Sequence, residues 1–567
     1  MKNKIIYVLS FLLVGVLACN DEFSDTPAIG ALSDEILQSE TGVDILLVGA
    51  YSVLDGIRKH GGSDWSQTGD NWWFDVIADD AHKGSNDSDQ QLLYNLEVYD
   101  WDSSNSYLLG KWKALFAGVN RCNNVLAKIK GVNESGVQGI DLSRQEGEAR
   151  FLRAYFNFEL QKIFGNVPFI SVENYIAEEY TQPNPGAIWD RIEADFQAAI
   201  DLLPEELPEE IKTEVGRPLK NTAKAFLGKT KLYQSKWAEA LTLFQEVINS
   251  GKYELQNEFV DNFRFAGENS KESVFAIQFT ADSGSSYNGN RGGTLNFGGP
   301  NGWCCGFYQP SQDLVNSFQT AGGLPLLDTY NQTDVTSDYG INSDEAFTPY
   351  AGALDPRLDY TVGRRGIEYN GWGIDPGKNW VRAAFVDISG PYLPKKNVYY
   401  NGDSGNMGTG PWGQQRSGIN YNIMRYADVL LMAAEAAVET GDNATALTYV
   451  NMVRNRAKNM TYVAGATNYK VESYTAFTDQ VMARKAVRME RRLELGMEGH
   501  RLFDVRRWNN SAEIMNAYFK NEARVITSFK DRPDEAPKKY EDKHEMMPIP
   551  LQAIDQSENV LEQNTGF

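Results

Sequence analysis

The spacing of apolar residues divides this chain into two helical regions separated by a long region without helical periodicity. In residues 41–253, and in residues 421–567 before an irregular C-terminal tail, apolar side chains recur at i, i+3, i+4 and i+7, the pattern of an amphipathic helix. Residues 254–420 instead hold glycine clusters, Asn-Gly turn signals and short alternating runs such as 273–279, which indicate strands. The sequence therefore predicts a mainly α protein with a loop-rich, minor-β insertion.

Two stretches of the helical regions have the spacing of tetratricopeptide units. Gly228 is followed by Ala240 and Phe244, which places small residues where two antiparallel helices cross. In the second helical region, Ala434 and Ala446 are separated by the same number of residues as Gly228 and Ala240. We expect a tetratricopeptide-like helical scaffold, although unrelated helical hairpins would satisfy two such loose matches.

The first residues have the layout of an export signal. Within residues 1–18, two lysines precede an apolar run that is too short to span a bilayer, and Cys19 follows a small alanine. This layout is typical of a bacterial lipoprotein whose leader is removed and whose new N-terminal cysteine is acylated. Residues 19–40 would then be the lipid anchor and tether. The alternative is an ordinary secretory signal with an incidental cysteine.

The composition excludes several classes of protein. The formal charge is −22, and loss of the two lysines of the leader takes it to −24. Such a chain repels phosphate backbones, which argues against binding to nucleic acid. Neither a P-loop nor a HExxH or GxSxG motif occurs. Aromatic residues make up 12% of the chain, enough to supply rings to a ligand as well as to the core.

The remaining cysteines and acidic clusters give no strong cofactor signal. Cys122 lies in a helical pattern and is expected to be a core residue. Cys304 and Cys305 are adjacent, so a reduced or partly oxidised pair is the default, although an exported protein permits the bond. Residues 86–89 could hold Ca²⁺, but they lack the glycine and glutamate of an EF-hand loop, and a solvated loop is the better expectation. No other cofactor is predicted.

Ordered blocks run along the chain from Cys19 to the C-terminus. They are RFLRAY at 150–155, FGNVP at 164–168, RYADVLLM at 425–432, NMVRNRA at 451–457 and EGHRLFDVRRW at 498–508. Together they resemble the SusD/RagB-like family of outer-membrane lipoproteins. The acidic residues that follow Cys19 also resemble the signal that sends such lipoproteins to the outer face of the outer membrane.

The resemblance implies a fold, a location, a partner and a function. It implies a SusD-like fold of tetratricopeptide-like helix pairs whose insertion carries the ligand face. It also implies a lipid-anchored protein on the cell exterior that sits over a SusC-like TonB-dependent transporter. We therefore expect a non-catalytic lipoprotein that captures oligosaccharides and delivers them to this transporter. A surface glycan hydrolase and a peptide-binding RagB-like lipoprotein are the alternatives.

Two acidic and basic motifs have the appearance of active sites but are better explained as scaffold. Within the block at 498–508, Glu498 with Arg501, and Asp504 with Arg507, are spaced to pair along one helix. We likewise expect Arg425, Asp428 and Glu435 to be internal hydrogen-bonding groups. The adjacent acids at 79–80 would point in opposite directions on a strand, which suits acid–base catalysis poorly.

Candidate ligand residues are aromatic and lie among turn formers. A sugar ring presents apolar C–H faces to an aromatic ring and a hydroxyl rim to polar side chains. The residues that combine these features are Trp303, Trp101, Trp65, Trp372 and Tyr287, with Asp64 and Arg365 as polar partners. Trp303 is the first choice, because it follows a glycine-rich segment that lets a ligand approach closely. The alternative for each ring is a place at the edge of the core.

Overall fold

The computed structural model describes most of the chain after the N-terminal segment. The described residues are 39–57, 65–86, 88–136, 139–281, 289–290, 299, 305–381, 390–396, 398–409, 415–465, 468–526, 529 and 539–567. Within them, helices predominate and strands are short, as the sequence predicts.

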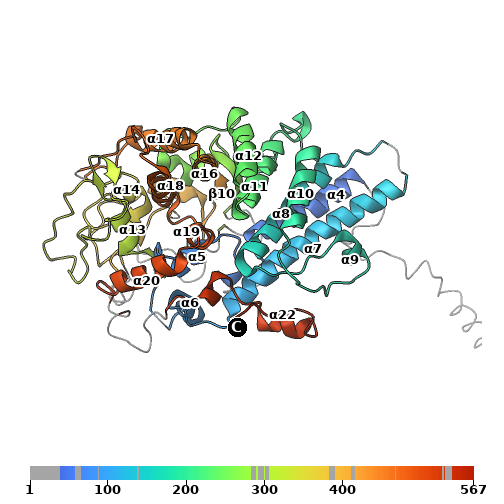
Figure 1. Cartoon of the computed structure of the whole chain (residues 1–567), viewed down its shortest axis with the longest axis horizontal. Helices are drawn as coiled ribbons and strands as arrows, with labels where there is room; N and C mark the ends of the chain where they lie inside the picture. Colours follow the sequence, from blue (N-terminus) through green and yellow to red (C-terminus); the bar gives the residue numbers. More distant parts are fainter. Residues whose placement is uncertain are drawn as a thin grey trace, which may run out of the picture.

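The helices form a scaffold that extends across the long axis of the molecule (Figure 1). They are α4 (Glu40–Tyr51), α5 (Trp72–Ile77), α6 (Gln91–Glu97), α7 (Ser106–Glu134), α8 (Ser143–Phe164), α9 (Val172–Ile176), α10 (Trp189–Leu202), α11 (Lys220–Tyr233), α12 (Trp237–Asn249), α13 (Gln312–Ser317), α14 (Leu358–Thr361), α16 (Tyr426–Glu439), α17 (Asn443–Asn459), α18 (Gln480–Leu495), α19 (Arg501–Arg507), α20 (Ser511–Glu522) and α22 (Leu551–Gln556). Short 3₁₀ helices occur at η1 (Ser52–Asp55), η2 (Trp65–Gln67), η3 (Glu209–Ile211), η4 (Phe259–Phe263), η5 (Phe265–Gly267), η7 (Asn401–Asn406) and η9 (Asp542–Glu545).

Neighbouring helices pack as antiparallel pairs, and their small residues explain how closely they approach. The order of contact is α7 with α8, α8 with α10, α10 with α11, α11 with α12, α12 with α16, and α16 with α17 and α18. A Cβ on Gly228 of α11 would lie only 2.7 Å from a ring carbon of Phe244 on α12. Ala240, Ala434 and Ala446 are fully buried. The tetratricopeptide-like interpretation of these two pairs is confirmed.

The strands form two-stranded antiparallel ladders, and all of them except β1 lie in the region between α12 and α16, together with the short helices α13 and α14. The strands are β1 (Ala81–Gly84), β2 (Ser273–Ile277), β3 (Phe307–Pro310), β4 (Thr320–Ala321), β5 (Leu324–Pro325), β6 (Val362–Gly363), β7 (Leu393–Pro394), β8 (Met407–Thr409), β9 (Gln415–Ser417) and β10 (Tyr421–Arg425). They pair as β1–β3, β2–β10, β4–β5, β6–β7 and β8–β9.

The β2–β10 ladder closes this loop-rich region at its root. Tyr421 pairs with Ile277 and Arg425 with Ser273, so the chain leaves and re-enters the helical scaffold at one place. β10 runs directly into α16, and the Tyr426 N–H donates to the Glu272 carbonyl. The β1–β3 ladder, in which His82 lies opposite Gln309, fastens the same region to the N-terminal part of the chain.

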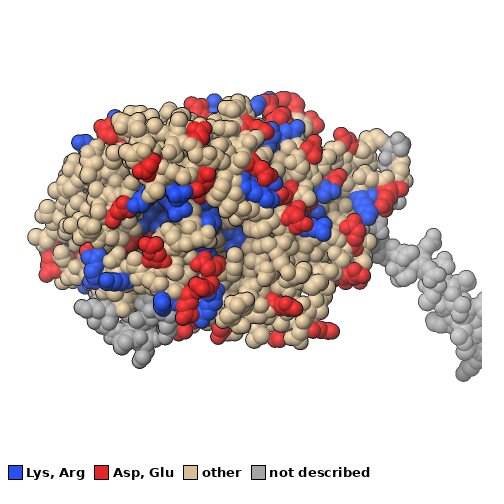
Figure 2. Space-filling view, in the orientation of Figure 1, with Lys and Arg blue, Asp and Glu red and all other residues tan. Residues whose placement is uncertain are grey.

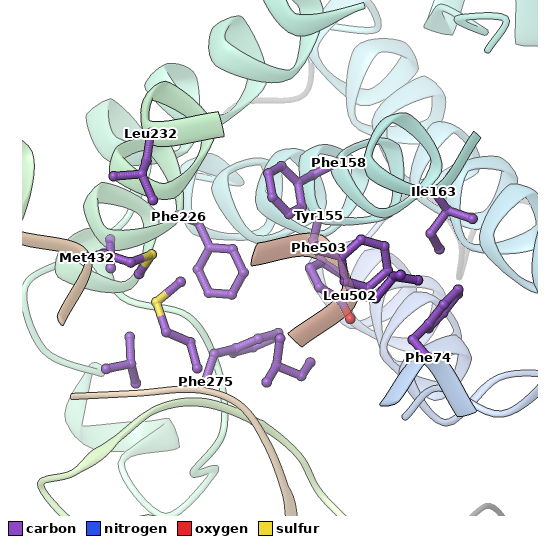
Figure 3. Packing of buried hydrophobic residues seen from close by; sticks show 14 of the residues in the cluster. Phe74, Tyr155, Phe158, Ile163, Phe226, Leu232, Phe275, Met432, Leu502 and Phe503 are labelled. Carbon is purple, nitrogen blue, oxygen red and sulfur yellow. The ribbon is translucent and has the colours of Figure 1, made fainter. Parts of the chain in front are cut away.

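Aromatic rings from both helical regions meet the root of the insertion in one main hydrophobic core (Figure 3). Phe151 of α8 lies edge-on to Phe226 of α11 and Phe275 of β2, with ring centroids 5.2 and 4.9 Å away. Such edge-to-face pairs contribute about 0.5–1.5 kcal/mol beyond their buried area. Trp72 and Trp73 are both almost completely buried here, although an adjacent pair must point in different directions.

The block at 498–508 is scaffold, but one of its two expected ion pairs is wrong. Asp504 does pair with Arg507, at 2.7 Å. Glu498 instead accepts from Arg425 at 2.8 Å, because it lies in the turn between α18 and α19 and not on a helix. Met497 and Gly499 on either side have φ of 65° and 78°, which ends the helical spacing.

The two carboxylates at 79–80 are also structural. Arg501 donates to both oxygens of Asp79 at 2.7 and 2.8 Å, and Arg492 donates to Asp80 at 2.9 Å. Both acids are buried. Arg425, Asp428 and Glu435 are buried and ion-paired as well, which confirms their expected role as internal groups of the fold. No helix among the described residues is long and apolar enough to cross a membrane.

Candidate functional site

Trp372 lies at the tip of a loop that the sequence builds with a tight turn. Asn370 and Gly371 adopt φ of 48° and 76°, the left-handed conformation that Asn-Gly pairs tolerate best. The Tyr369 N–H donates to the Gly373 carbonyl across this turn at 2.9 Å. The Asn370 side chain donates to the carbonyls of Lys395 and Val398, which holds the loop against the segment before η7.

The turn places Trp372 in a second hydrophobic cluster that is separate from the main core. The Trp372 and Tyr399 rings lie edge to face with centroids 5.7 Å apart, and Trp372 Nε1 donates to the Tyr399 carbonyl. Trp380 packs on Tyr369 in the same cluster, at 5.8 Å. Trp372 and Trp380 are only half-buried. We call Trp372, Trp380 and Tyr399 the aromatic ledge.

A narrow recess lined with polar side chains lies beside the ledge. Its lining includes Tyr399, Val398 and Ile419 together with Asn290, Ser417, Asn420 and Asn422. The volume is about 30 Å³, room for about one water molecule. The recess itself is therefore too small for a sugar ring, and Tyr399 is the residue that it shares with the aromatic ledge.

Arg365 lies at the base of the same loop, where it braces the backbone. Its guanidinium donates to the carbonyls of Asn342, Ser343 and Glu345, at 3.1, 3.0 and 2.5 Å. Beneath the loop, burial raises the pKa of Asp375 to about 7, and its carboxylate accepts from the Gly377 N–H. Arg365 thus fixes the position of the loop that carries Trp372.

Trp65 and Trp101 lie in the main core. Trp65 is 7% exposed and Trp101 is 8% exposed. The Trp101 ring packs against Tyr99 and His544, with centroids 4.8 and 4.9 Å away. In this conformation neither ring offers a face to a ligand. Trp303, Tyr287, Asp64 and Cys19 lie outside the described residues.

The loop suggested for Ca²⁺ is organised by a lysine. Lys83 Nζ donates to the carbonyls of Gly84, Asn86 and Asp89, at 3.0, 2.5 and 2.7 Å. The ammonium thus occupies a position where carbonyl oxygens converge, and Asp89 also accepts from Ser85. Among the described residues, no group of three or more His, Cys, Asp or Glu could hold a metal ion.

The cysteines differ from one another in state. Cys122 is free and fully buried, as the helical pattern predicts. Cys305 is disulfide-bonded, an outcome that the sequence left open.

The sequence analysis missed two members of the aromatic ledge. Tyr399 stands just before the Asn-Gly pair at 401–402, and Trp380 follows Gly377 by three residues. Both therefore carry the signal that singled out Trp372, an aromatic residue beside a turn former.

Comparison with known proteins places the chain in a family. The model of the SusD family matches residues 271–567, and a second model, described as starch-binding associating with outer membrane, matches residues 28–232. The SusD-like protein P25 of Formosa agariphila is 26% identical, and the match covers 100% of this chain and 99% of that protein.

Solved structures share the fold over nearly the whole chain. A SusD-like protein from Bacteroides fragilis has a TM-score of 0.69 at 23% identity and covers 94% of this chain and 99% of its own. Surface glycan-binding protein A from Bacteroides thetaiotaomicron, solved in complex with laminarihexaose, has a TM-score of 0.62 at 19% identity and covers 93% and 99%. Since the family model spans more than half of the sequence, this chain belongs to the SusD family.

Proposed function

We propose that this chain is a non-catalytic, glycan-binding lipoprotein of the cell surface. In this proposal it captures oligosaccharides and delivers them to a SusC-like TonB-dependent transporter in the outer membrane. Family membership supports the proposal, as does the laminarihexaose complex of a protein with the same fold. The single observation that carries it is the aromatic ledge, where two half-buried tryptophans pack with Tyr399, a buried ring that also lines a polar recess.

The ledge has the chemistry that a sugar ring requires. The apolar C–H face of a pyranose can stack on the accessible part of Trp372, while hydroxyl groups reach polar atoms at the rim. Ile374, next to the turn, is 57% exposed and extends the apolar surface. The ledge is shallow, which suits a segment of a longer chain lying across it better than an enclosed monosaccharide.

The other residues that the sequence singled out have different roles in the proposal. Trp303, Tyr287 and Asp64 stay proposed ligand contacts, to be tested by substitution. Arg365 is proposed to act by positioning the Trp372 loop. Trp65 and Trp101 could contribute only after a rearrangement that exposes them, because both are more than nine-tenths buried.

The test begins with a glycan array on the soluble chain and continues with calorimetry on the preferred oligosaccharide. Trp372→Ala should weaken binding by about 5- to 150-fold, since loss of one stacking platform costs about 1–3 kcal/mol. Trp303→Ala is measured alongside. Trp237→Ala removes another half-buried tryptophan, from the scaffold, and should leave the affinity unchanged. Unaltered binding by Trp372→Ala would remove the ledge from the site, and selective binding of peptides would favour the peptide-binding alternative.

The hydrolase alternative has one observation in its favour. Burial and the neighbouring Asp79 raise the pKa of Asp313 to about 6, while Arg492 and Arg501 outweigh burial and lower the pKa of Asp79 to about 2. A raised and a lowered carboxyl group are what a glycosidase needs. However, Arg492 donates to Asp313 at 2.7 Å, and Asn331 donates to its other oxygen. We therefore expect no release of reducing ends that scales with protein concentration.

A further inference from the structure

A large cavity lies between α18, α20 and the segment 327–332, and it shares no lining residue with the aromatic ledge. Its volume is about 700 Å³, within the range of pockets that hold small ligands. The basic residues that line it are Arg484, Lys485, Arg488, Arg492 and Arg501. Figure 2 shows Lys and Arg side chains gathered around a depression over α18 and α19. We call this cavity the arginine pocket.

Four of the five cations are neutralised by carboxylates. The pairs are Arg492 with Asp80 and Asp313 (2.9 and 2.7 Å), Arg501 with Asp79 (2.7 Å), Arg484 with Glu439 (2.6 Å) and Lys485 with Asp328 (2.7 Å). The acids that line the pocket are Asp79, Asp313, Asp328 and Glu513. The first three are used in these pairs, and the exposed Glu513 is the fourth.

Arg488 is the cation without such a partner among the described residues. Its Nε is buried and makes no hydrogen bond there. Its guanidinium stacks on Trp508 at 4.7 Å, and the same ring also faces Arg507 at 5.2 Å. The nearby Glu435 is already occupied, since Arg507 donates to both its oxygens and Trp508 Nε1 donates at 2.9 Å.

The surroundings of Arg488 make it a receptor for an anion. Burial lowers its pKa, and the charges of Arg507 and Arg484 lower it further against the opposing effects of Glu435 and Glu439. A buried donor without an acceptor is unfavourable, because it has lost its hydrogen bonds to water and gained none in return. A bound oxyanion would remove this cost and balance the charge, and a guanidinium binds a planar or tetrahedral oxyanion through two parallel N–H groups.

Asn510 adds a second buried group that has no hydrogen-bond partner in the described part of the chain, and this group is an acceptor where that of Arg488 is a donor. Its side-chain oxygen Oδ1 is buried without a hydrogen-bond partner among the described residues, and Asn510 lines the same pocket. A sulfate ion has no proton to donate to this oxygen, whereas a sugar hydroxyl group can donate. Two further carboxamides, Gln332 and Asn521, also line the cavity.

We propose that the arginine pocket is a second binding site, which takes an acidic sugar residue. In this arrangement the carboxylate or sulfate ester lies on Arg488, and a sugar hydroxyl donates to Asn510 Oδ1. The proposal rests on the proposed function for the class of ligand, a saccharide, but uses a different surface. It adds selectivity for charged glycans to a chain whose overall charge is strongly negative.

The experiment compares three ligands that share one ring. Galacturonic acid, galactose 6-sulfate and galactose are titrated into the soluble chain by ligand-observed NMR. At least one acidic sugar should bind about 10- to 100-fold more tightly than galactose, as expected for a charge-assisted hydrogen bond. The two acidic ligands distinguish a carboxylate from a sulfate ester. Arg488→Gln should abolish the preference, and melting curves report whether this variant folds.

Two further variants keep the proposal testable even if the Arg488→Gln variant does not fold. Glu513→Gln removes the exposed acid of the pocket and should strengthen binding of the acidic sugar. Lys212→Gln removes one exposed cation from outside the pocket and should change nothing. Equal affinity for all three sugars would overturn the proposal, and so would unchanged binding by Glu513→Gln or equally tight binding of inorganic sulfate. Failure of the aromatic ledge to bind neutral oligosaccharides would count against the proposed function alone.

Discussion

Arg425 illustrates how single buried charges join distant parts of this chain. It is 1% exposed and donates to Glu272 at 2.9 Å, Glu494 at 2.6 Å and Glu498 at 2.8 Å. These three carboxylates come from the residue just before β2, the end of α18 and the turn before α19. One guanidinium therefore fastens the root of the insertion to the C-terminal helices.

Loss of this guanidinium should be strongly destabilising. Arg425→Met removes one cation from a buried network of carboxylates and leaves its negative charge under-compensated, which costs about 3–5 kcal/mol. Urea unfolding should show a much lower midpoint, or the variant should accumulate poorly. Lys271→Met, in an ion pair with Glu254 whose side chains are about 70% exposed, is the control and should change stability by less than about 1 kcal/mol. Equal midpoints for the two variants would contradict the structural role of Arg425.

His82 makes stability depend on pH in the alkaline range. Its ring nitrogens lie 2.9 Å from Glu97 and 2.8 Å from Glu522, in the β1–β3 ladder. Burial alone would lower its pKa, but the hydrogen bonds and charges of Glu522 and Glu97 outweigh burial and raise the pKa to about 9. A raised folded-state pKa means stability that is complete below the unfolded value, near 6.5, and is lost as pH rises through about 9.

The expected loss is on the order of 3 kcal/mol, since each pKa unit corresponds to about 1.4 kcal/mol. Urea unfolding at pH 6, 8 and 10 measures it. Comparison with His82→Gln at each pH isolates this group, because other titrating residues are common to both proteins. The stability difference between the two should shrink from pH 6 to pH 10. A constant difference would show that His82 is not charged in the folded protein.

At the scale of elements, the α11–α12 hairpin depends on the absence of a side chain at Gly228. An added Cβ would lie 2.7 Å from Phe244, whose ring is fully buried and cannot withdraw. Gly228→Ala should therefore destabilise the protein by about 1–3 kcal/mol, as overpacking does. Gly131→Ala in α7 is the matched control, because no atom lies within 4 Å of its new Cβ.

The control substitution should have the opposite sign. An exposed glycine within a helix costs about 0.5–1 kcal/mol relative to alanine, so Gly131→Ala should raise the melting temperature slightly. Thermal unfolding of the two variants beside the parent protein measures both effects. If both variants melt at a higher temperature than the parent protein, the close approach of the two helices does not require a glycine at position 228.

Elements that depend on local sequence could be predicted, whereas contacts between distant segments could not. Helices, the insertion and the Gly228 crossing follow from periodicity and spacing, which are local properties. The Asn-Gly turn likewise pointed to Trp372. Burial of Trp101 was not predictable, because its ring is covered by His544, which lies more than four hundred residues later in the chain. The predicted ion pair of Glu498 with Arg501 was wrong for a local reason, since the chain turns at Met497 and Gly499 and the two residues do not share a helix.

At the scale of the whole molecule, the proposed delivery of glycans to an outer-membrane transporter calls for an anchor that keeps the protein at that membrane. The described helices contain no membrane span, and the proposed anchor is an acyl group on Cys19. An anchor of this kind relies on the covalent lipid, since acyl chains contribute about 0.8 kcal/mol per buried CH₂ group. The protein surface itself, with its net negative charge, offers little attraction to anionic lipids.

Cys19→Ala should therefore separate the protein from the outer membrane without unfolding it. We expect the variant in the soluble fraction or retained at the inner membrane. It should also carry no lipid label when the cells are grown with labelled palmitate, and it should not be labelled at the surface of intact cells. Cys122→Ala is the matched control, because that cysteine is free and buried in α7, far in sequence from the leader. It should keep both the lipid label and surface accessibility. Undiminished surface labelling of Cys19→Ala would mean that the cysteine is incidental and that the leader is an ordinary secretory signal.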